Sequence, residues 1–149
     1  MALIDLIVPE VVKTPLVSKD KPDVLRELVQ VLKDAGRIDD FDAVLQAVQQ
    51  REDLQSTGLE EGIAVPHGKT AAVSRLQIAL GIAPQGIDFS SLDGKPTQLF
   101  FLLVASPEQS GPHVEALAEV AKLARSKAFC RALIGADNPQ EVVELIRGE

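Results

Sequence analysis

The chain has 149 residues, of which 46% are hydrophobic and 25% are charged, and its formal net charge at pH 7 is -7. This length and apolar content suit one globular domain, and we take residues 1–149 as that domain. Proteins that bind nucleic acid normally present a basic surface to the phosphate backbone, so we expect no nucleic-acid partner. An acidic surface favours basic protein partners instead.

The sequence carries no signal for membrane insertion or export. No apolar run approaches the roughly 20 residues that a transmembrane helix needs. The segment MALIDLIVPE at the start also lacks the basic stretch that precedes the apolar core of a signal peptide. We therefore expect a cytoplasmic protein that is not inserted in a membrane.

The first third of the chain contains two amphipathic patterns. Residues 22–35 and 40–51 both repeat apolar side chains at the spacing of a helix. Pro22 and Gly36 bound the first pattern, as is typical of helix starts and stops. We predict two helices here, the second of which ends near Arg51.

Three segments in the middle of the chain predict strands: 63–65, 76–83 and 99–105. Residues 76–83 alternate large apolar with small or polar side chains, which is the period of a strand. Residues 99–105 are apolar throughout, which is typical of a central strand covered on both faces. Turn residues between 86 and 96 indicate the connection between these two strands.

Helical patterns return after Ser106 and continue to the end of the chain. We predict a helix through residues 114–124, a short helix around 127–135, and a last helix that begins at Asn138. The order of helices, then strands, then helices predicts a single α/β domain, with a mixed central β-sheet flanked by helices on both sides.

Both histidines of the chain, His67 and His113, follow a predicted strand. Ligands of open α/β sheets bind beyond the carboxyl ends of strands, so we expect the two rings to meet in one cleft. His113 falls in the first turn of its helix, where unpaired N–H groups favour an anion and disfavour the imidazolium. His67 lies between Pro66 and Gly68, in what reads as a short rigid connection that leaves room for a partner. His67 therefore suits a phosphoryl acceptor and His113 a supporting group, although a hydrogen-bonded structural role remains the alternative for each.

Arg51 stands before the loop that leads to the His67 strand. A guanidinium grips two phosphate oxygens at once, which is one role for this side chain. The alternative is capping of the helix carbonyls, since the helix dipole favours a cation there. Ser56 and Thr57 in the same loop are candidates for phosphate support, and a simple turn with Gly58 is their alternative role.

Other chemistries lack their motifs in this sequence. There is no HExxH motif and Cys130 has no second cysteine to pair with, so zinc ligation has little support, although His67, His113 and a carboxylate stay open as a ligand set. The GxSxG motif of serine hydrolases is absent, as are the Walker loop and GxGxxG of nucleotide-binding proteins. We expect neither a metal nor a cofactor.

Seven blocks of the sequence, in order, carry a specific resemblance. They are residues 51–52, 56–58, 62–69 (GIAVPHGK), 87–89, 92–94 and 101–105, followed by His113 with its helix. Together they resemble the type 2 enzyme IIA domain of the bacterial phosphotransferase system, which is the mannitol/fructose type and includes the nitrogen-regulatory branch. The likeness covers nearly the whole chain, and the GIAVPHG block is the most specific part of it.

The resemblance implies a phosphotransferase with a phosphohistidine intermediate and a mixed α/β fold. His67 would carry the phosphoryl group, His113 would hydrogen-bond it and Arg51 would balance its charge. Glu61 falls where some relatives have a carboxylate near the active histidine.

The resemblance also implies protein partners. The donor would be HPr or a nitrogen-branch HPr-like protein, and the acceptor would be a IIB domain or a regulatory target protein. We expect no attached IIB, IIC or HPr-like domain, which fits either a separate IIA subunit of a transporter or a regulator. We favour the regulatory branch over sugar transport, because nothing in the sequence is specific to a sugar. The alternative from another class is a protein-binding module that has lost phosphorylation.

Overall fold

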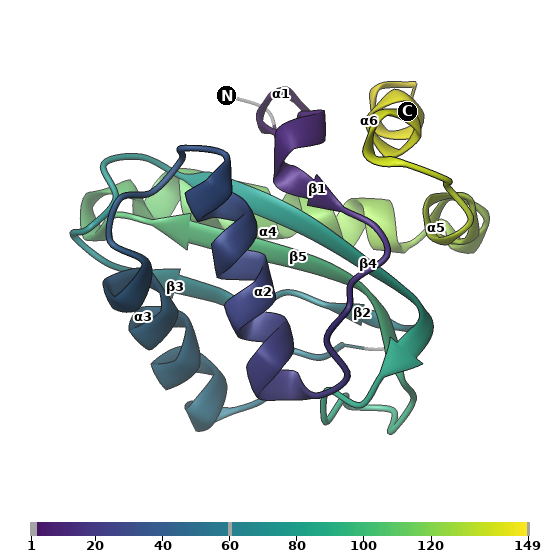
Figure 1. Ribbon diagram of the computed structural model, residues 1–149, viewed down its shortest axis with the longest axis horizontal. Helices are drawn as coiled ribbons and strands as arrows, with labels where there is room; N and C mark the ends of the chain where they lie inside the picture. Colours follow the sequence, from purple (N-terminus) through teal and green to yellow (C-terminus); the bar gives the residue numbers. More distant parts are fainter. Residues whose placement is uncertain (1–2, 60, 149) are drawn as a thin grey trace.

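A mixed β-sheet runs through the middle of the molecule, and helices cover both of its faces (Figure 1). The computed structural model describes residues 3–59 and 61–148. The elements in chain order are α1 (Leu3–Leu6), η1 (Pro9–Val11, a 3-10 helix), β1 (Val12–Lys13), α2 (Lys21–Asp34), α3 (Phe41–Leu54), β2 (Ile63–Ala64), β3 (His67–Lys69), β4 (Gln77–Ile87), β5 (Thr97–Ala105), η2 (Pro107–Gln109, a 3-10 helix), α4 (Ser110–Ala124), α5 (Lys127–Ile134) and α6 (Pro139–Arg147). The predicted fold class is confirmed.

The strand order of the sheet is β1-β4-β5, with β2 and β3 one after the other along the free edge of β5. β4 and β5 pair antiparallel, whereas β1 pairs parallel with β4. β2 and β3 both pair parallel with β5, in a register that places Ile63 beside Leu99 and His67 beside Leu103. The carboxyl ends of β3 and β5 therefore lie together.

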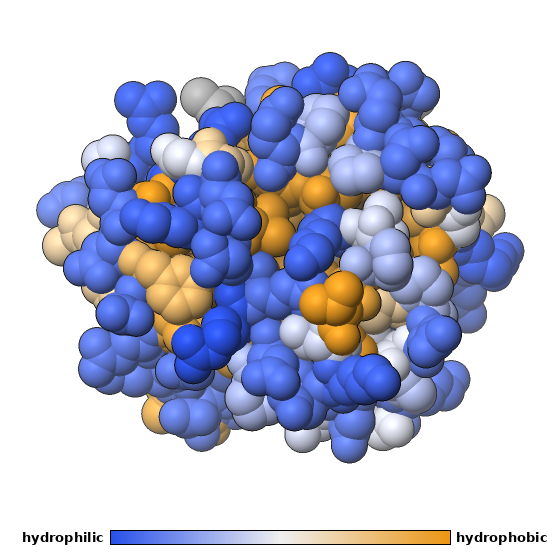
Figure 2. Space-filling view, in the orientation of Figure 1, coloured by the Kyte–Doolittle hydropathy of each residue, from blue (hydrophilic) through white to orange (hydrophobic). Residues whose placement is uncertain are grey.

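The central strand β5 is covered on both faces, as its apolar sequence predicts. Alternate residues of β5 belong to two different core clusters. Phe100, Leu102 and Val104 pack with α2 and α3. Leu99, Phe101, Leu103 and Ala105 pack with α4, α5 and α6. Hydrophilic residues cover most of the face seen in Figure 2, because the helices turn their apolar sides toward the sheet.

Side-chain caps start the predicted helices where the sequence indicates. Asp20 accepts a hydrogen bond from the backbone of Asp23 at the start of α2, and Asn138 accepts one from Glu141 at the start of α6. The predicted end of α3 at Arg51 is wrong, since the helix continues to Leu54. No Gly or Pro interrupts this stretch, so the helix ends when Gln55 adopts an extended backbone.

Short elements escape the sequence analysis. β1 precedes the first long helix, which corrects the expected order of helices, then strands, then helices. Two or three residues carry no measurable period, so neither β1 nor β3 gives a signal in the sequence. β4 also extends beyond residue 83 to Ile87, through an irregular pairing that accommodates Pro84. Within the described parts of the chain, no helix has the length and apolar content to cross a membrane.

Candidate active site

His67 and His113 meet at the carboxyl end of β3 and β5. Their ring centroids are 5.2 Å apart and the rings are perpendicular. The pairing of His67 with Leu103 puts both side chains on the face of the sheet that α4 covers. His113 is the fourth residue of α4 and so lies in its first turn. The expected meeting of the two histidines is confirmed.

A single hydrogen bond orients the ring of His67. Its Nδ1 lies 2.8 Å from the carbonyl oxygen of Val65. Because a carbonyl only accepts, Nδ1 must carry the hydrogen, and the lone pair of the neutral ring is then at Nε2. The nitrogen that can attack an electrophile is thereby fixed.

Several groups act on the pKa of His67, and together they lower it from the usual value. Burial is the largest cause, and the positive charges of Arg51 and Lys69 act in the same direction. The hydrogen bond to Val65 and the negative charge of Glu52 oppose this effect. His67 is therefore neutral at pH 7.

His113 is more deeply buried, with 3% of its surface exposed. Burial, followed by the nearby His67 and Lys69, lowers its pKa to about 4. Among the described residues, neither ring nitrogen has a hydrogen-bond partner. Buried polar atoms almost always have partners, so a ring left in this state beside a second histidine is an indication of function.

Gly68 brings β3 into direct contact with α3. A Cβ at this position would lie 3.0 Å from the carbonyl carbon of Ala47 and 3.1 Å from the nitrogen of Val48, so the backbone of α3 would have to shift by a few tenths of an ångström. The interpretation of residues 66–68 as a mere connection is therefore corrected, because His67 begins a strand that is held between α3 and β5. Lys69 ties the same strand to α4 through a 3.0 Å hydrogen bond from its Nζ to the Ser110 hydroxyl.

Arg51 takes one of the two roles that the sequence left open, the capping of helix carbonyls. Its Nη1 donates a 2.8 Å hydrogen bond to the carbonyl oxygen of Gln55, which satisfies a group at the end of α3. Its charge also lowers the pKa of His67. The side chain thus caps the helix and acts on the histidine, while its contact with phosphate stays a prediction.

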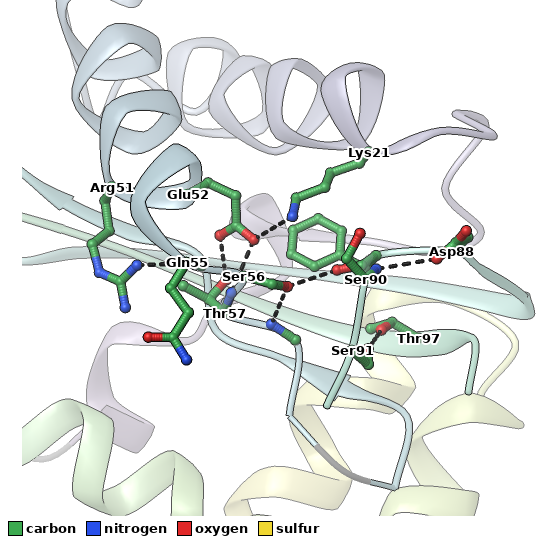
Figure 3. A network of polar contacts seen from close by, with 12 residues as sticks. Lys21, Arg51, Glu52, Gln55, Ser56, Thr57, Asp88, Ser90, Ser91 and Thr97 are labelled. Carbon is green, nitrogen blue, oxygen red and sulfur yellow. Dashed lines mark hydrogen bonds and ion pairs between the residues drawn. The ribbon is translucent and has the colours of Figure 1, made fainter. Parts of the chain in front are cut away.

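The loop after α3 is built by its own hydroxyl groups (Figure 3). The Ser56 hydroxyl donates to the Phe89 carbonyl oxygen at 2.7 Å and accepts from the Gly58 nitrogen at 3.1 Å. The Thr57 hydroxyl donates to Glu52 at 2.6 Å. These contacts correspond to the turn role of Ser56 and Thr57, and their support of phosphate stays a prediction.

Glu52 is a residue that the sequence analysis missed. It is 5% exposed, and its carboxylate accepts hydrogen bonds from Thr57 and pairs with Lys21 (Figure 3). The signal was its position four residues after Val48 and eight after Val44, on the buried side of the helix. Because the predicted helix ended near Arg51, the buried pattern was not extended to Glu52.

Glu61 does not join the two histidines. It precedes β2, whose Ile63 pairs with Leu99, whereas His67 pairs with Leu103. Four residues along β5 correspond to about 13 Å. The Glu61 carboxylate instead lies 3.7 Å from the ammonium group of Lys127. The expected place of Glu61 beside the active histidine is therefore corrected.

The described residues also bear on metal binding. Across 3–59 and 61–148, no three side chains of the types His, Cys, Asp and Glu come together in a way that could hold a metal ion. The two histidines thus have no third ligand of this kind in that part of the chain.

Comparison with known proteins agrees with this site and fold. Residues 5–148 match the family described as phosphoenolpyruvate-dependent sugar phosphotransferase system, EIIA 2. The chain belongs to this family. Members of the EIIA type 2 family act as phosphoryl carriers, so the general role is that of a phosphotransferase component.

Relatives of this EIIA domain come from both sugar transport and regulation. The chain is 36% identical, over 98% of its length, to the PTS system fructose-specific EIIABC component of Bacillus subtilis, and spans 23% of that protein. It is 30% identical to the nitrogen regulatory protein of Bradyrhizobium diazoefficiens, with 98% of this chain and 95% of that protein covered. Among solved structures, nitrogen regulatory protein IIA-Ntr of Neisseria meningitidis superposes with a TM-score of 0.88 at 25% identity, covering 97% of this chain and 98% of the other.

Proposed function

We propose that this EIIA domain accepts a phosphoryl group on Nε2 of His67 from a phosphohistidine donor and transfers it to a second protein. The hydrogen bond between Nδ1 of His67 and the Val65 carbonyl oxygen carries this proposal. It keeps the proton on one side of the ring and leaves the lone pair on the other. The lowered pKa keeps that lone pair free at pH 7.

The transfer requires little covalent chemistry from the protein. The lone pair of Nε2 attacks phosphorus in line with the donor nitrogen, and the new N–P bond forms as the old one breaks. The electron pair of the broken bond returns to the ring of the donor, and the proton of His67 stays on Nδ1, hydrogen-bonded to the Val65 carbonyl oxygen. Positioning and charge stabilisation supply most of the rate enhancement in such a step.

Three groups near His67 suit the stabilisation of phosphoryl oxygens. Arg51 and Lys69 bring positive charge to the site, as their effects on the pKa of His67 indicate. His113 is neutral at pH 7, and its ring N–H is a hydrogen-bond donor without a partner among the described residues. The first turn of α4 adds backbone N–H groups that no helical carbonyl accepts.

The donor in this proposal is HPr or a nitrogen-branch HPr-like protein, and the acceptor is a IIB domain or a regulatory target. A fructose-specific relative and a nitrogen regulatory relative of similar identity support both kinds of acceptor. We retain the regulatory branch as the preferred prediction. A transport subunit would lose its phosphate to IIB, whereas a regulator would retain it as a signal.

Phosphorylation with purified components tests the acceptor. Wild type and His67→Ala are incubated with enzyme I, HPr and labelled phosphoenolpyruvate, and acid-labile label on the protein is measured. We expect label on the wild type and none on the variant, with Lys127→Ala, far from the site, as a matched control that labels normally. Equal label on His67→Ala would exclude His67. Absence of label on the wild type, with HPr and with a nitrogen-branch donor, would favour the binding module that has lost phosphorylation.

A further inference from the structure

We propose that Glu52 is the positioning residue for His67: it fixes the loop after α3 to the strand that holds the ring, and so determines the orientation of Nε2. This inference rests on the proposed function of His67. Glu52 does not contact the reacting atoms in this role. It acts through Thr57 and Val65, and the case begins with its buried carboxylate.

Each oxygen of the Glu52 carboxylate has a partner (Figure 3). Oε1 accepts a 2.9 Å hydrogen bond from the Thr57 nitrogen and lies 2.8 Å from the Lys21 ammonium group. Oε2 accepts a 2.6 Å hydrogen bond from the Thr57 hydroxyl. A charge that is 5% exposed is costly unless it is paired, so this arrangement holds only while Thr57 and Lys21 keep their places.

Thr57 passes this restraint on to the strand before His67. Its carbonyl oxygen accepts a 3.1 Å hydrogen bond from the Val65 nitrogen, and Gly58 forms an antiparallel bridge with Ala64. The Val65 carbonyl oxygen in turn accepts the hydrogen bond from Nδ1 of His67. An unbroken series of hydrogen bonds therefore runs from Glu52 through Thr57 and Val65 to the His67 ring.

The charge of Glu52 also reaches the ring. Of the charged groups that act on His67, Arg51 on α3 and Lys69 on β3 lower its pKa, and Glu52 raises it. His113 on α4 is neutral at pH 7, and on the α2 side Lys21 pairs directly with Glu52. Glu52 thus supports the basicity of the attacking nitrogen while it restrains the loop.

Three substitutions separate positioning from stability. Glu52→Gln keeps the shape of the side chain but leaves one acceptor oxygen for the two donors of Thr57. Thr57→Val removes the hydroxyl donor and leaves the charge of Glu52 in place. Asp53→Asn is the matched control, because it removes the same charge from the neighbouring, exposed position of α3. For each folded variant, the phosphorylation rate of His67 is measured, together with the pKa and tautomer of its ring from nitrogen-15 NMR signals.

We expect Glu52→Gln to slow phosphorylation about tenfold or more, to lower the pKa of His67 and to reduce the Nδ1–H tautomer. Thr57→Val should slow phosphorylation and shift the tautomer without removing the charge, and Asp53→Asn should match wild type. If Glu52→Gln folds and its His67 tautomer, pKa and rate equal those of Asp53→Asn, Glu52 is structural and the inference is wrong. If Glu52→Gln does not fold, Thr57→Val decides instead: a His67 tautomer and phosphorylation rate equal to those of Asp53→Asn would make the inference wrong. Failure of the wild type to label would refute the proposed function, whereas the NMR readouts would still test the link between Glu52 and the ring.

Discussion

Gly68 lies against the backbone of Ala47 so closely that a Cβ would be 3.0 Å from the Ala47 carbonyl carbon. Helix α3 and strand β3 therefore touch without an intervening side chain, directly beside His67. This contact explains why residue 68 is a glycine. It is a better explanation than a need to leave open space beside His67. Any side chain at residue 68 must push the strand away from the helix.

Gly68→Ala should accordingly destabilise the protein by about 1–3 kcal/mol, which is typical of overpacking. It should also slow labelling of His67, because β3 carries the ring. Gly135→Ala is the control, since the nearest atom to a Cβ there is the Arg131 carbonyl oxygen at 3.5 Å, an ordinary van der Waals contact. Urea unfolding and phosphorylation rates of both variants check the prediction. Equal stability of the two variants would show that α3 and β3 separate without cost.

Arg51→Ala should change phosphorylation more than stability. Loss of the hydrogen bond to the Gln55 carbonyl oxygen should cost about 1 kcal/mol of unfolding free energy. Loss of the charge should raise the pKa of His67 and slow phosphoryl transfer. Arg51→Lys keeps the positive charge but lacks the planar guanidinium that can bind two oxygens at once. It should therefore keep the pKa of His67 near that of the wild type but recover only part of the phosphorylation rate. A variant with normal transfer and reduced stability would limit Arg51 to capping.

The outline of this fold was readable in the sequence where signals were long. Residues 99–105 predicted a doubly covered strand because seven apolar residues in a row leave no face for water. β3 was missed because three residues, one of them a glycine, show no alternation, and its pairing with β5 comes from tertiary contact. The predicted meeting of His67 and His113 followed from their places after strands, a rule about topology that needs no side-chain detail.

The finer parts of the site were beyond such rules. The resemblance to the family placed Glu61 near the active histidine. The extended chain between Glu61 and His67 follows β5, however, so the two residues lie at different positions along that strand. Glu52 was overlooked because an acidic residue near a helix end usually faces solvent. Its burial depends on Lys21 and Thr57, which lie on other segments and pair with it only after folding.

His113 should make stability depend on pH. Its pKa is about 4 in the folded protein, against 6.5 for the free side chain. Above pH 6.5 the ring is neutral in the folded and in the unfolded protein, so it does not affect the free energy of unfolding. As the pH falls, the ring binds a proton in the unfolded chain but stays neutral in the folded protein, which lowers the free energy of unfolding. Between pH 7 and pH 4, wild type should therefore lose about 3 kcal/mol more unfolding free energy than His113→Asn, at 1.36 kcal/mol per pKa unit. Urea titrations at several pH values measure this difference, and parallel curves for the two proteins would contradict the low pKa.

His113 should assist the phosphoryl group without carrying it. Its ring lies 5.2 Å from that of His67, and its donor has no partner in the described part of the chain. It is therefore placed to hydrogen-bond phosphoryl oxygens once Nε2 of His67 holds the phosphorus. His113→Ala should thus still accept label, but hold it less stably or pass it on more slowly. Label retention and transfer to a cognate acceptor are followed over time. Complete loss of labelling with His67 intact would make His113 the acceptor or an essential first stop.

Phosphorylation should also change which partners bind. A phosphoryl group on His67 adds negative charge to a chain whose net charge is already -7, so it should weaken contacts with acidic partners and strengthen those with basic ones. Products of genes that flank this one are the candidates, and pull-downs compare the phosphorylated wild type with His67→Ala, which cannot carry the group. A IIB or IIC product that removes the phosphate would establish transport and contradict our preference for regulation. A partner retained by one phosphorylation state, with no loss of phosphate to it, would support a regulator, because a signal must outlast the encounter that reads it.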